Sequence, residues 1–190
     1  MPSIVIVSGS SSPTSRLNAL VEASESYFSG EGFAVHTIIV SELPADDLIR
    51  ANFQSEAIRE KTELVRKADA LIVASPVYKA AYTGVLKTFL DMIPEKGLEG
   101  KIVLPLFIGG SIAHLLAIDY ALKPVLSALS ARHILGGVYA VDQWIQRAEG
   151  GGFSMQEELA SRLNQSLVEL KEEVVRKAGL PLADSARHGN

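Results

Sequence analysis

The segment from Ile4 to Arg16 reads IVIVSGSSSPTSR, an apolar run followed by a loop of small residues that leads into a helical pattern. The apolar run predicts a buried strand, and the spacing of apolar residues that follows predicts a helix from about Thr14 to Phe28. A helix N-terminus carries unpaired backbone N–H groups and partial positive charge, so a loop of Gly and Ser before it can wrap a phosphate closely. We therefore predict an anion-binding loop between strand and helix.

Hydroxyl groups and one guanidinium are the candidate ligands in this loop. Ser10, Ser12 and Ser15 supply hydroxyl donors, and Arg16 supplies a planar group suited to a phosphate dianion. The alternative is that these residues only cap the helix and form a turn, although capping needs a single hydroxyl. The loop has neither the lysine of a nucleoside-triphosphate P-loop nor the three spaced glycines of a dinucleotide-binding loop. Glu42, near the end of the next apolar run, could be the acidic ribose ligand of a dinucleotide fold, but with a single glycine in the loop this signal is weak. A single terminal phosphate fits better.

Composition limits the function classes. A chain of 190 residues that is 47% hydrophobic can bury a full core, and the absence of cysteine removes disulfides, thiol catalysis and Cys-ligated metals. The formal net charge of −4 argues against a nucleic-acid binder. Four scattered histidines give no metal-ligand spacing, and no apolar run approaches the roughly 20 residues that span a bilayer. With no leader pattern at the N-terminus, we expect a cytoplasmic protein without membrane or nucleic-acid partners.

Further apolar runs alternate with helical patterns along the rest of the chain. Strands are predicted over residues 33–40, 70–75, 102–108 and 134–141, and helices over 55–68, 85–93, 112–129 and 159–174. Pro76 is expected to end the third strand, and residues 142–154 to form a flexible loop. We expect one domain over residues 1–178 and a loose tail over 179–190.

Strands without polar alternation are typical of parallel sheets covered on both faces. Five strands alternating with helices predict a three-layer α/β sandwich with strand order 2-1-3-4-5, whose ligands bind at the carboxyl ends of strands one, three and four. Two more loops lie at that edge. The loop after strand three contains Pro76, Val77, Tyr78 and Lys79, and the loop after strand four contains Gly109, Gly110 and Ser111.

These loops together resemble the NAD(P)H-dependent FMN reductase family of flavodoxin-like flavoproteins. The matching motifs are Gly9-Ser10 with Ser15-Arg16, then Pro76-x-Tyr78, then Gly109-Gly110. Two longer strings, PVYKAAYTG over residues 76–84 and HLLAIDYALKPVLSAL over 114–129, are similar to the branch that supplies reduced flavin to alkanesulfonate monooxygenases.

The resemblance implies an enzyme that uses NADPH or NADH to reduce FMN and releases the product to a partner monooxygenase in sulfur assimilation. It also implies a flavodoxin-like fold, a homotetramer and hydride transfer between stacked rings, which needs no catalytic side chain. The implied cofactor-binding residues are Ser10, Ser12, Ser15, Arg16, Pro76, Val77, Tyr78, Lys79, Gly109, Gly110 and Ser111. Relatives in this branch tend to carry Thr where this chain has Ile108, so a hydroxyl contact to flavin is not expected there.

Pro124 lies inside the predicted helix 112–129 and cannot donate to the carbonyl of Tyr120, four residues earlier. We expect a kink or a wide π-type turn at Tyr120, because such turns relieve a missing hydrogen bond. The related branch carries an inserted Tyr in a π-helical turn at its tetramer interface near the flavin. Our hypothesis is that Tyr120 stacks across a subunit contact and controls flavin release. The alternative is a plain kink with Tyr120 in the core.

Two other functions are compatible with the sequence. One is a reductase that retains its FMN and reduces quinones, azo dyes or metal ions. The other is a non-catalytic flavodoxin-like electron carrier. The sequence does not decide between NADPH and NADH, because no 2′-phosphate site is recognisable.

Overall fold

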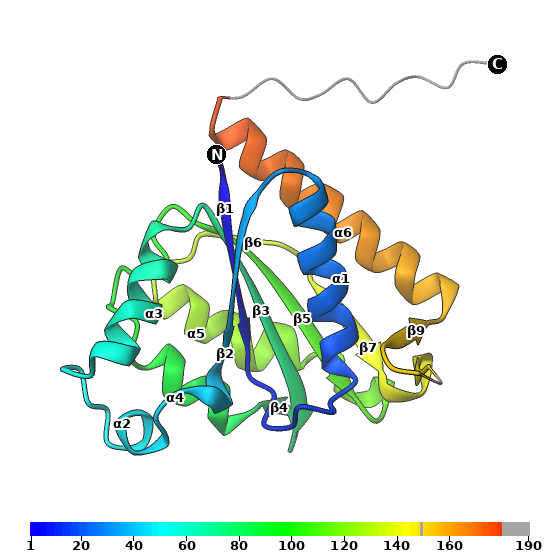
Figure 1. Cartoon of the computed structure of the whole chain (residues 1–190), viewed down its shortest axis with the longest axis horizontal. Coiled ribbons are helices and arrows are strands. Elements are labelled where there is room, and N and C mark those ends of the chain that lie inside the picture. Colours follow the sequence, from blue (N-terminus) through cyan, green and yellow to red (C-terminus); the bar gives the residue numbers. More distant parts are fainter. Residues whose placement is uncertain (149, 180–190) are drawn as a thin grey trace.

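The computed structural model describes residues 1–148 and 150–179. A parallel sheet with the order β2-β1-β3-β5-β6 forms its centre, and β7 continues the position of β6 beside β5 (Figure 1). Counted along the chain, this is the predicted order 2-1-3-4-5, and the flavodoxin-like fold is confirmed. The predicted tail over residues 179–190 falls, apart from Gly179, outside the described residues.

The first four long strands differ from the predictions mainly at their ends, whereas the short strands β4, β8 and β9 were not predicted. The strands are β1 (Ser3–Ser8), β2 (Ala34–Ile39), β3 (Ala70–Tyr78), β4 (Ala81–Tyr82), β5 (Ile102–Gly109), β6 (His133–Ile134), β7 (Val138–Val141), β8 (Ile145–Arg147) and β9 (Phe153–Met155). The α-helices are α1 (Leu17–Gly30), α2 (Ala45–Ile49), α3 (Glu56–Lys67), α4 (Gly84–Leu90), α5 (Lys123–Ala128) and α6 (Glu157–Lys177).

Two hydrophobic clusters fill the space on either side of the sheet. Along β1, Ile4 and Ile6 pack toward α1 and α6, whereas Val5 and Val7 pack toward α3, α4 and α5. Successive side chains of a strand point to opposite faces, so a wholly apolar strand contributes to both clusters. Figure 1 shows the resulting three layers.

The prediction that Pro76 ends the third strand is wrong, because β3 continues to Tyr78. The carbonyl of Ala74 accepts the N–H of Gly9 at 2.8 Å, and Pro76, two residues on, directs its backbone to the same side. β1 pairs with β3 only as far as Ala74. The missing N–H of proline therefore leaves no ladder bond unfilled at this position.

The predicted strand 134–141 is interrupted, and its two parts are β6 and β7. Ile134 pairs with Val103 and Val138 pairs with Leu106, so three residues of one strand lie opposite two of its neighbour. One of those two is Pro105, which has no N–H to donate to the ladder. A bulge forms there, with Gly137 at a φ of 83°.

The prediction of a single helix over 112–129 is also wrong. The segment forms a 3-10 turn at Ile112–His114, a π turn at Ile118–Leu122 and then α5. The expected wide turn at Tyr120 is confirmed, because Pro124 cannot supply the regular hydrogen bond. Tyr120 is 79% exposed, so the alternative that placed it in the core is excluded.

Two smaller corrections concern segments next to the predicted anion loop. Helix α1 begins at Leu17 and not at Thr14, so the loop after β1 is longer than expected. The segment expected to be a flexible loop, 142–154, contains β8 and β9, which pair as an antiparallel hairpin in which Ile145 lies opposite Met155. The hairpin packs beside the N-terminal end of α1 (Figure 1).

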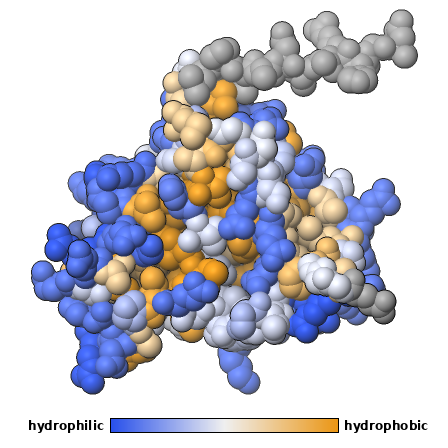
Figure 2. Space-filling view, in the orientation of Figure 1, coloured by the Kyte–Doolittle hydropathy of each residue, from blue (hydrophilic) through white to orange (hydrophobic). Residues whose placement is uncertain are grey.

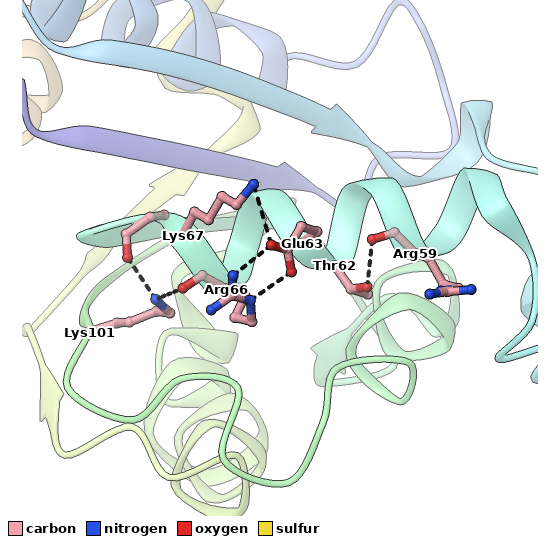
Figure 3. Close-up of polar contacts among 7 residues, drawn as sticks. Arg59, Thr62, Glu63, Arg66, Lys67 and Lys101 are labelled. Atoms are coloured by element: carbon pink, nitrogen blue, oxygen red, sulfur yellow. Dashed lines mark hydrogen bonds and ion pairs between the residues drawn. The ribbon is translucent and has the colours of Figure 1, made fainter.

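The C-terminus of α3 is held by the residue that precedes β5. Lys101 is 8% exposed, and its Nζ donates to the carbonyls of Arg66 and Ala68, each at 2.7 Å (Figure 3). Burial lowers the pKa of this amino group. On the exposed side of the same helix, hydrogen bonds from Arg66 and Lys67 lower the pKa of Glu63 to about 2. This network lies at the edge of the sheet opposite the predicted site.

The edge strand β2 is less covered than its neighbour β1. Three of its six residues are half-buried and two are exposed, including Ile39 at 39%. Figure 2 shows apolar residues in the middle of this face, between margins of hydrophilic residues.

Within the described residues, no helix has the length and apolarity needed to cross a membrane.

The turn between β3 and β4 supplies a stability prediction. Lys79 and Ala80 have φ values of 50° and 65°, as a two-residue turn of type I′ requires, yet neither is glycine. Ala80→Gly is expected to stabilise the protein by about 1 kcal/mol, because a non-glycine residue pays for left-handed backbone. The unfolding midpoint should rise by roughly 2–4 °C. Ala81→Gly, one residue later in β4, should lower it, and a lower midpoint for Ala80→Gly would contradict the turn geometry.

Candidate functional site

The loop from Ser8 to Arg16 lies close against the N-terminus of α4. A Cβ atom added to Gly9 would be 2.5 Å from Cβ of Leu86 and 3.0 Å from Oγ1 of Thr83. The Thr83 hydroxyl donates to the carbonyl of Gly9 at 2.7 Å and accepts the N–H of Leu86 at 3.1 Å. Because Thr83 is 2% exposed, both bonds are shielded from water. This contact fixes the start of the loop.

Hydrogen bonds within the loop set its curvature. The Ser10 hydroxyl donates to the carbonyl of Ser12 at 3.0 Å and accepts the N–H of Ser12 at 3.3 Å. The Ser12 hydroxyl lies 3.2 Å from Oγ1 of Thr14, and Ser15 accepts the N–H of Leu17 at 3.2 Å. The hydroxyl groups of Ser10, Ser12 and Ser15 therefore form hydrogen bonds that shape the loop, as the capping alternative expects. A hydroxyl that makes such a bond can also contact a phosphate.

The three predicted loops meet at one cavity of about 240 Å³ at the carboxyl ends of β1, β3 and β5. Eight of the predicted residues line it: Ser12, Ser15, Arg16, Pro76, Val77, Tyr78, Gly109 and Gly110. The lining residues are of two chemical kinds. The first loop contributes hydroxyl and guanidinium groups, and the ends of β3 and β5 contribute the apolar side chains of Val77 and Ile108 with the exposed ring of Tyr78.

Gly109, which lines this cavity, permits a close approach of Tyr139 from the neighbouring strand β7. A Cβ on Gly109 would be 2.2 Å from the hydroxyl oxygen of Tyr139, which donates to the carbonyl of Ser111 at 2.7 Å. Burial raises the pKa of Tyr139, and the charge of Asp142 raises it further. The hydroxyl therefore keeps its proton and holds the loop that follows β5.

Three predicted residues do not line this cavity. Ser10 is 4% exposed and lines a separate cavity of about 380 Å³ beside Glu42, on the other side of the first loop. Lys79 lies in the turn between β3 and β4. The Ser111 hydroxyl accepts the N–H of Ala113 at 3.1 Å and so caps the following turn.

The structure also brings residues to the cavity that the sequence analysis missed. Asp142 follows β7, and Arg147 lies in β8, within a segment predicted to be a flexible loop. Thr83, which fixes the start of the first loop, was also not predicted to have a role. Only the fold reveals these positions, because each lies far along the chain from the loop that it contacts.

The arrangement of these loops agrees with what known proteins show. The model of the family "NADPH-dependent FMN reductase" matches residues 2–146, which is most of the chain. The chain belongs to the NADPH-dependent FMN reductase family. Membership makes it an oxidoreductase whose flavin is FMN and whose electron donor is a reduced nicotinamide nucleotide.

Individual FMN reductases are also similar to this chain in sequence and in structure. An FMN reductase (NADPH) from Pseudomonas putida is 47% identical over 165 residues, which cover 86% of this chain and 84% of the relative. The Escherichia coli FMN reductase (NADPH) is 49% identical over 142 residues, covering 75% and 74% of the two chains. The apo crystal structure of NADH:FMN oxidoreductase EmoB superposes with a TM-score of 0.82 at 34% identity, over 99% of this chain and 95% of that one.

The relatives that match this chain include reductases named for NADPH and reductases named for NADH. The NADH-dependent FMN reductase SfnF of Pseudomonas putida is 34% identical over 143 residues, covering 72% of this chain and 76% of the relative.

The residues of the cavity fit a flavin mononucleotide. A phosphate suits the hydroxyl and guanidinium groups, and a flat heterocycle suits Tyr78 and the glycine backbone. Asp142 is the acidic residue among those lining the cavity. In the described part of the chain, no three His, Asp or Glu side chains gather closely enough to hold a metal ion.

Proposed function

We propose that this protein reduces FMN with a reduced nicotinamide nucleotide and binds the flavin in the cavity lined by the three loops. The observation that carries the proposal is the meeting of Arg16, Tyr78 and Gly109–Gly110 in one cavity at the switch point of the sheet. When bound, FMN supplies the acceptor ring for a hydride from the nicotinamide stacked on it.

The side chains of the protein bind and orient the two rings. Ser12, Ser15 and Arg16 hold the phosphate, while Pro76, Val77 and Tyr78 support the ring system, with Lys79 at the rim. Gly109 and Gly110 let backbone N–H groups approach the ring edge, because neither residue has a side chain. Ser10 and Ser111 keep their loops in shape. The barrier falls because two reactants are held in register, and no side chain has to transfer a proton.

Oxidation of NADPH and NADH, each with and without added FMN, tests the proposal. We expect colourless purified protein that oxidises the nucleotide only when FMN is added. A yellow protein that reduces quinones or azo dyes would favour the flavin-retaining reductase. Protein that binds FMN but oxidises neither nucleotide would favour the electron carrier. The ratio of kcat/KM values for the two nucleotides also identifies the physiological donor.

We infer that a flavin-dependent monooxygenase of the alkanesulfonate type consumes the reduced flavin. The support is the similarity of residues 114–129 to the branch that serves such enzymes, together with the SfnE and SfnF relatives. A coupled assay tests it, since sulfite should form from an alkanesulfonate only when reductase, monooxygenase and FMN are all present. A cytoplasmic location stays a prediction.

We propose that the segment from Ile112 to Tyr120 forms a subunit interface of a homotetramer. Ile112, Leu115, Leu116 and Tyr120 are 51%, 45%, 53% and 79% exposed. Large apolar side chains gathered on one short segment mark an interaction surface. The same segment follows the Gly109–Gly110 loop directly, so a contact made there is coupled to the flavin cavity.

Tyr120→Ala is expected to shift the protein toward dimers and to change flavin retention, because it removes the most exposed aromatic ring of this surface. Molecular mass by sedimentation and the FMN content after gel filtration measure the two effects. Phe53→Ala is the matched control, since Phe53 is 58% exposed on another part of the molecule. An unchanged mass and unchanged retention in Tyr120→Ala would contradict the hypothesis.

A further inference from the structure

The β8–β9 hairpin is tied to the anion loop by two arginines that reach across in opposite directions. Nε of Arg16 donates to the carbonyl of Ile145 at 2.9 Å, and a terminal nitrogen of Arg147 donates to the carbonyl of Thr14. Arg16, at the end of the anion loop, therefore binds the backbone of the hairpin, and Arg147, in the hairpin, binds the backbone of the anion loop. Both side chains line the cavity with Thr14 and Ser15.

The base of the hairpin is firmly anchored, so Arg147 does not lie on an unsupported loop. Ile145 is 1% exposed and packs in the cluster beneath α1 and α6. The N–H of Gln156 donates to the carbonyl of Trp144 at 2.9 Å, which closes the base of the hairpin. Because side chains alternate along a strand, Ile145 and Arg147 point toward the protein, whereas Gln146 points to the opposite side.

The charges of the cavity lining suit a dianion. Arg16 and Arg147 contribute two positive charges, and Asp142 contributes one negative charge to the lining. A guanidinium carries five N–H donors, and each of the contacts described uses one of them. A phosphate monoester close to pH 7 carries nearly two negative charges and accepts several such hydrogen bonds.

We propose that Arg147 is a second phosphate-binding arginine, which makes the cavity select FMN over the unphosphorylated flavin. This inference rests on the proposed function and extends it, since Arg147 lies one residue beyond the part of the chain that the family model matches. The hairpin supplies the phosphate ligand on the side of the cavity that faces Arg16. Flavin affinity therefore depends on a segment distant in sequence from the loop after β1.

Equilibrium titration of FMN and riboflavin, followed by flavin fluorescence, tests the proposal in wild type, Arg147→Gln and Arg147→Lys. Loss of a charge-assisted hydrogen bond is expected to raise the Kd for FMN in Arg147→Gln by about tenfold or more, with the Kd for riboflavin unchanged. Arg147→Lys should recover part of the FMN affinity, because it keeps the charge but not the planar fork. Gln146→Ala is the matched control, and the unfolding midpoints of all variants verify that the fold is intact.

Several outcomes would overturn the proposal. If Arg147→Gln binds FMN and riboflavin more weakly by the same factor, Arg147 only shapes the loop. If the affinity for neither flavin falls, Arg147 is not part of the flavin site. A rise in KM for NADPH, with KM for NADH and the Kd for FMN unchanged, would assign Arg147 to the nucleotide 2′-phosphate instead. The titrations measure binding without turnover, so they test the role of Arg147 independently of the proposed reductase activity. Wild-type protein that binds neither flavin contradicts that function, whereas a phosphate-independent effect of Arg147→Gln contradicts this inference alone.

Discussion

Gly9→Ala is expected to lower the unfolding midpoint by roughly 3–10 °C and to weaken FMN binding about tenfold. The added methyl group would be 2.5 Å from Cβ of Leu86, a fully buried residue of α4. A Cβ atom moves only with its backbone, so either the loop or the helix must shift. Displacement of the loop also strains the 2.7 Å hydrogen bond from Thr83 to the carbonyl of Gly9.

Gly30→Ala is the matched control for this substitution. Gly30 ends α1, and a Cβ placed there meets no atom of the described residues within 4 Å apart from its chain neighbours and the backbone of its own helix. Its unfolding midpoint and its FMN affinity should stay close to those of wild type. Thermal unfolding and a fluorescence titration with FMN measure both variants. Gly9→Ala with wild-type values in both experiments would show that the loop does not pack against α4 as described.

Gly109→Ala is expected to destabilise the protein by about 1–3 kcal/mol and to raise the KM for FMN, because the new methyl group occupies the position of a buried hydroxyl. The clash distance to the Tyr139 oxygen is 2.2 Å. Tyr139 is 5% exposed and has little room to move. Its displacement breaks the hydrogen bond to Ser111 and so moves the loop at the flavin cavity.

A double variant distinguishes this clash from a general intolerance of alanine at Gly109. Tyr139→Phe removes only the oxygen, after which the nearest atom to the new methyl is the ring carbon at 3.2 Å. Tyr139→Phe alone should cost about 1 kcal/mol for the lost hydrogen bond. The double variant should be more stable than Gly109→Ala, a coupling that urea unfolding measures directly. Strictly additive losses would argue against the contact.

The prolines of this protein have different effects in a helix and in the sheet. Pro124 predicts the wide turn at Tyr120 from the sequence, because the hydrogen bond that proline cannot make lies within one helix. Pro76 and Pro105 act differently, since the effect of a missing N–H in a strand depends on which neighbour that strand has. Pro76 faces a position where β1 has ended, and Pro105 causes a bulge in the neighbouring strand. Neither neighbour is known before the sheet is assembled.

The sequence by itself determined the alternation of the central strands with helices, the strand order of the sheet and the edge at which the three loops meet. Those features follow from the period of apolar residues and from the handedness of strand connections, which are local properties. Only the tertiary structure decided which groups hold the loops around the cavity. Thr83 reaches Gly9, Tyr139 reaches Gly109, and Arg147 reaches Thr14. Each contact joins residues distant along the chain, so its geometry arises only when packing fixes the distance between their elements.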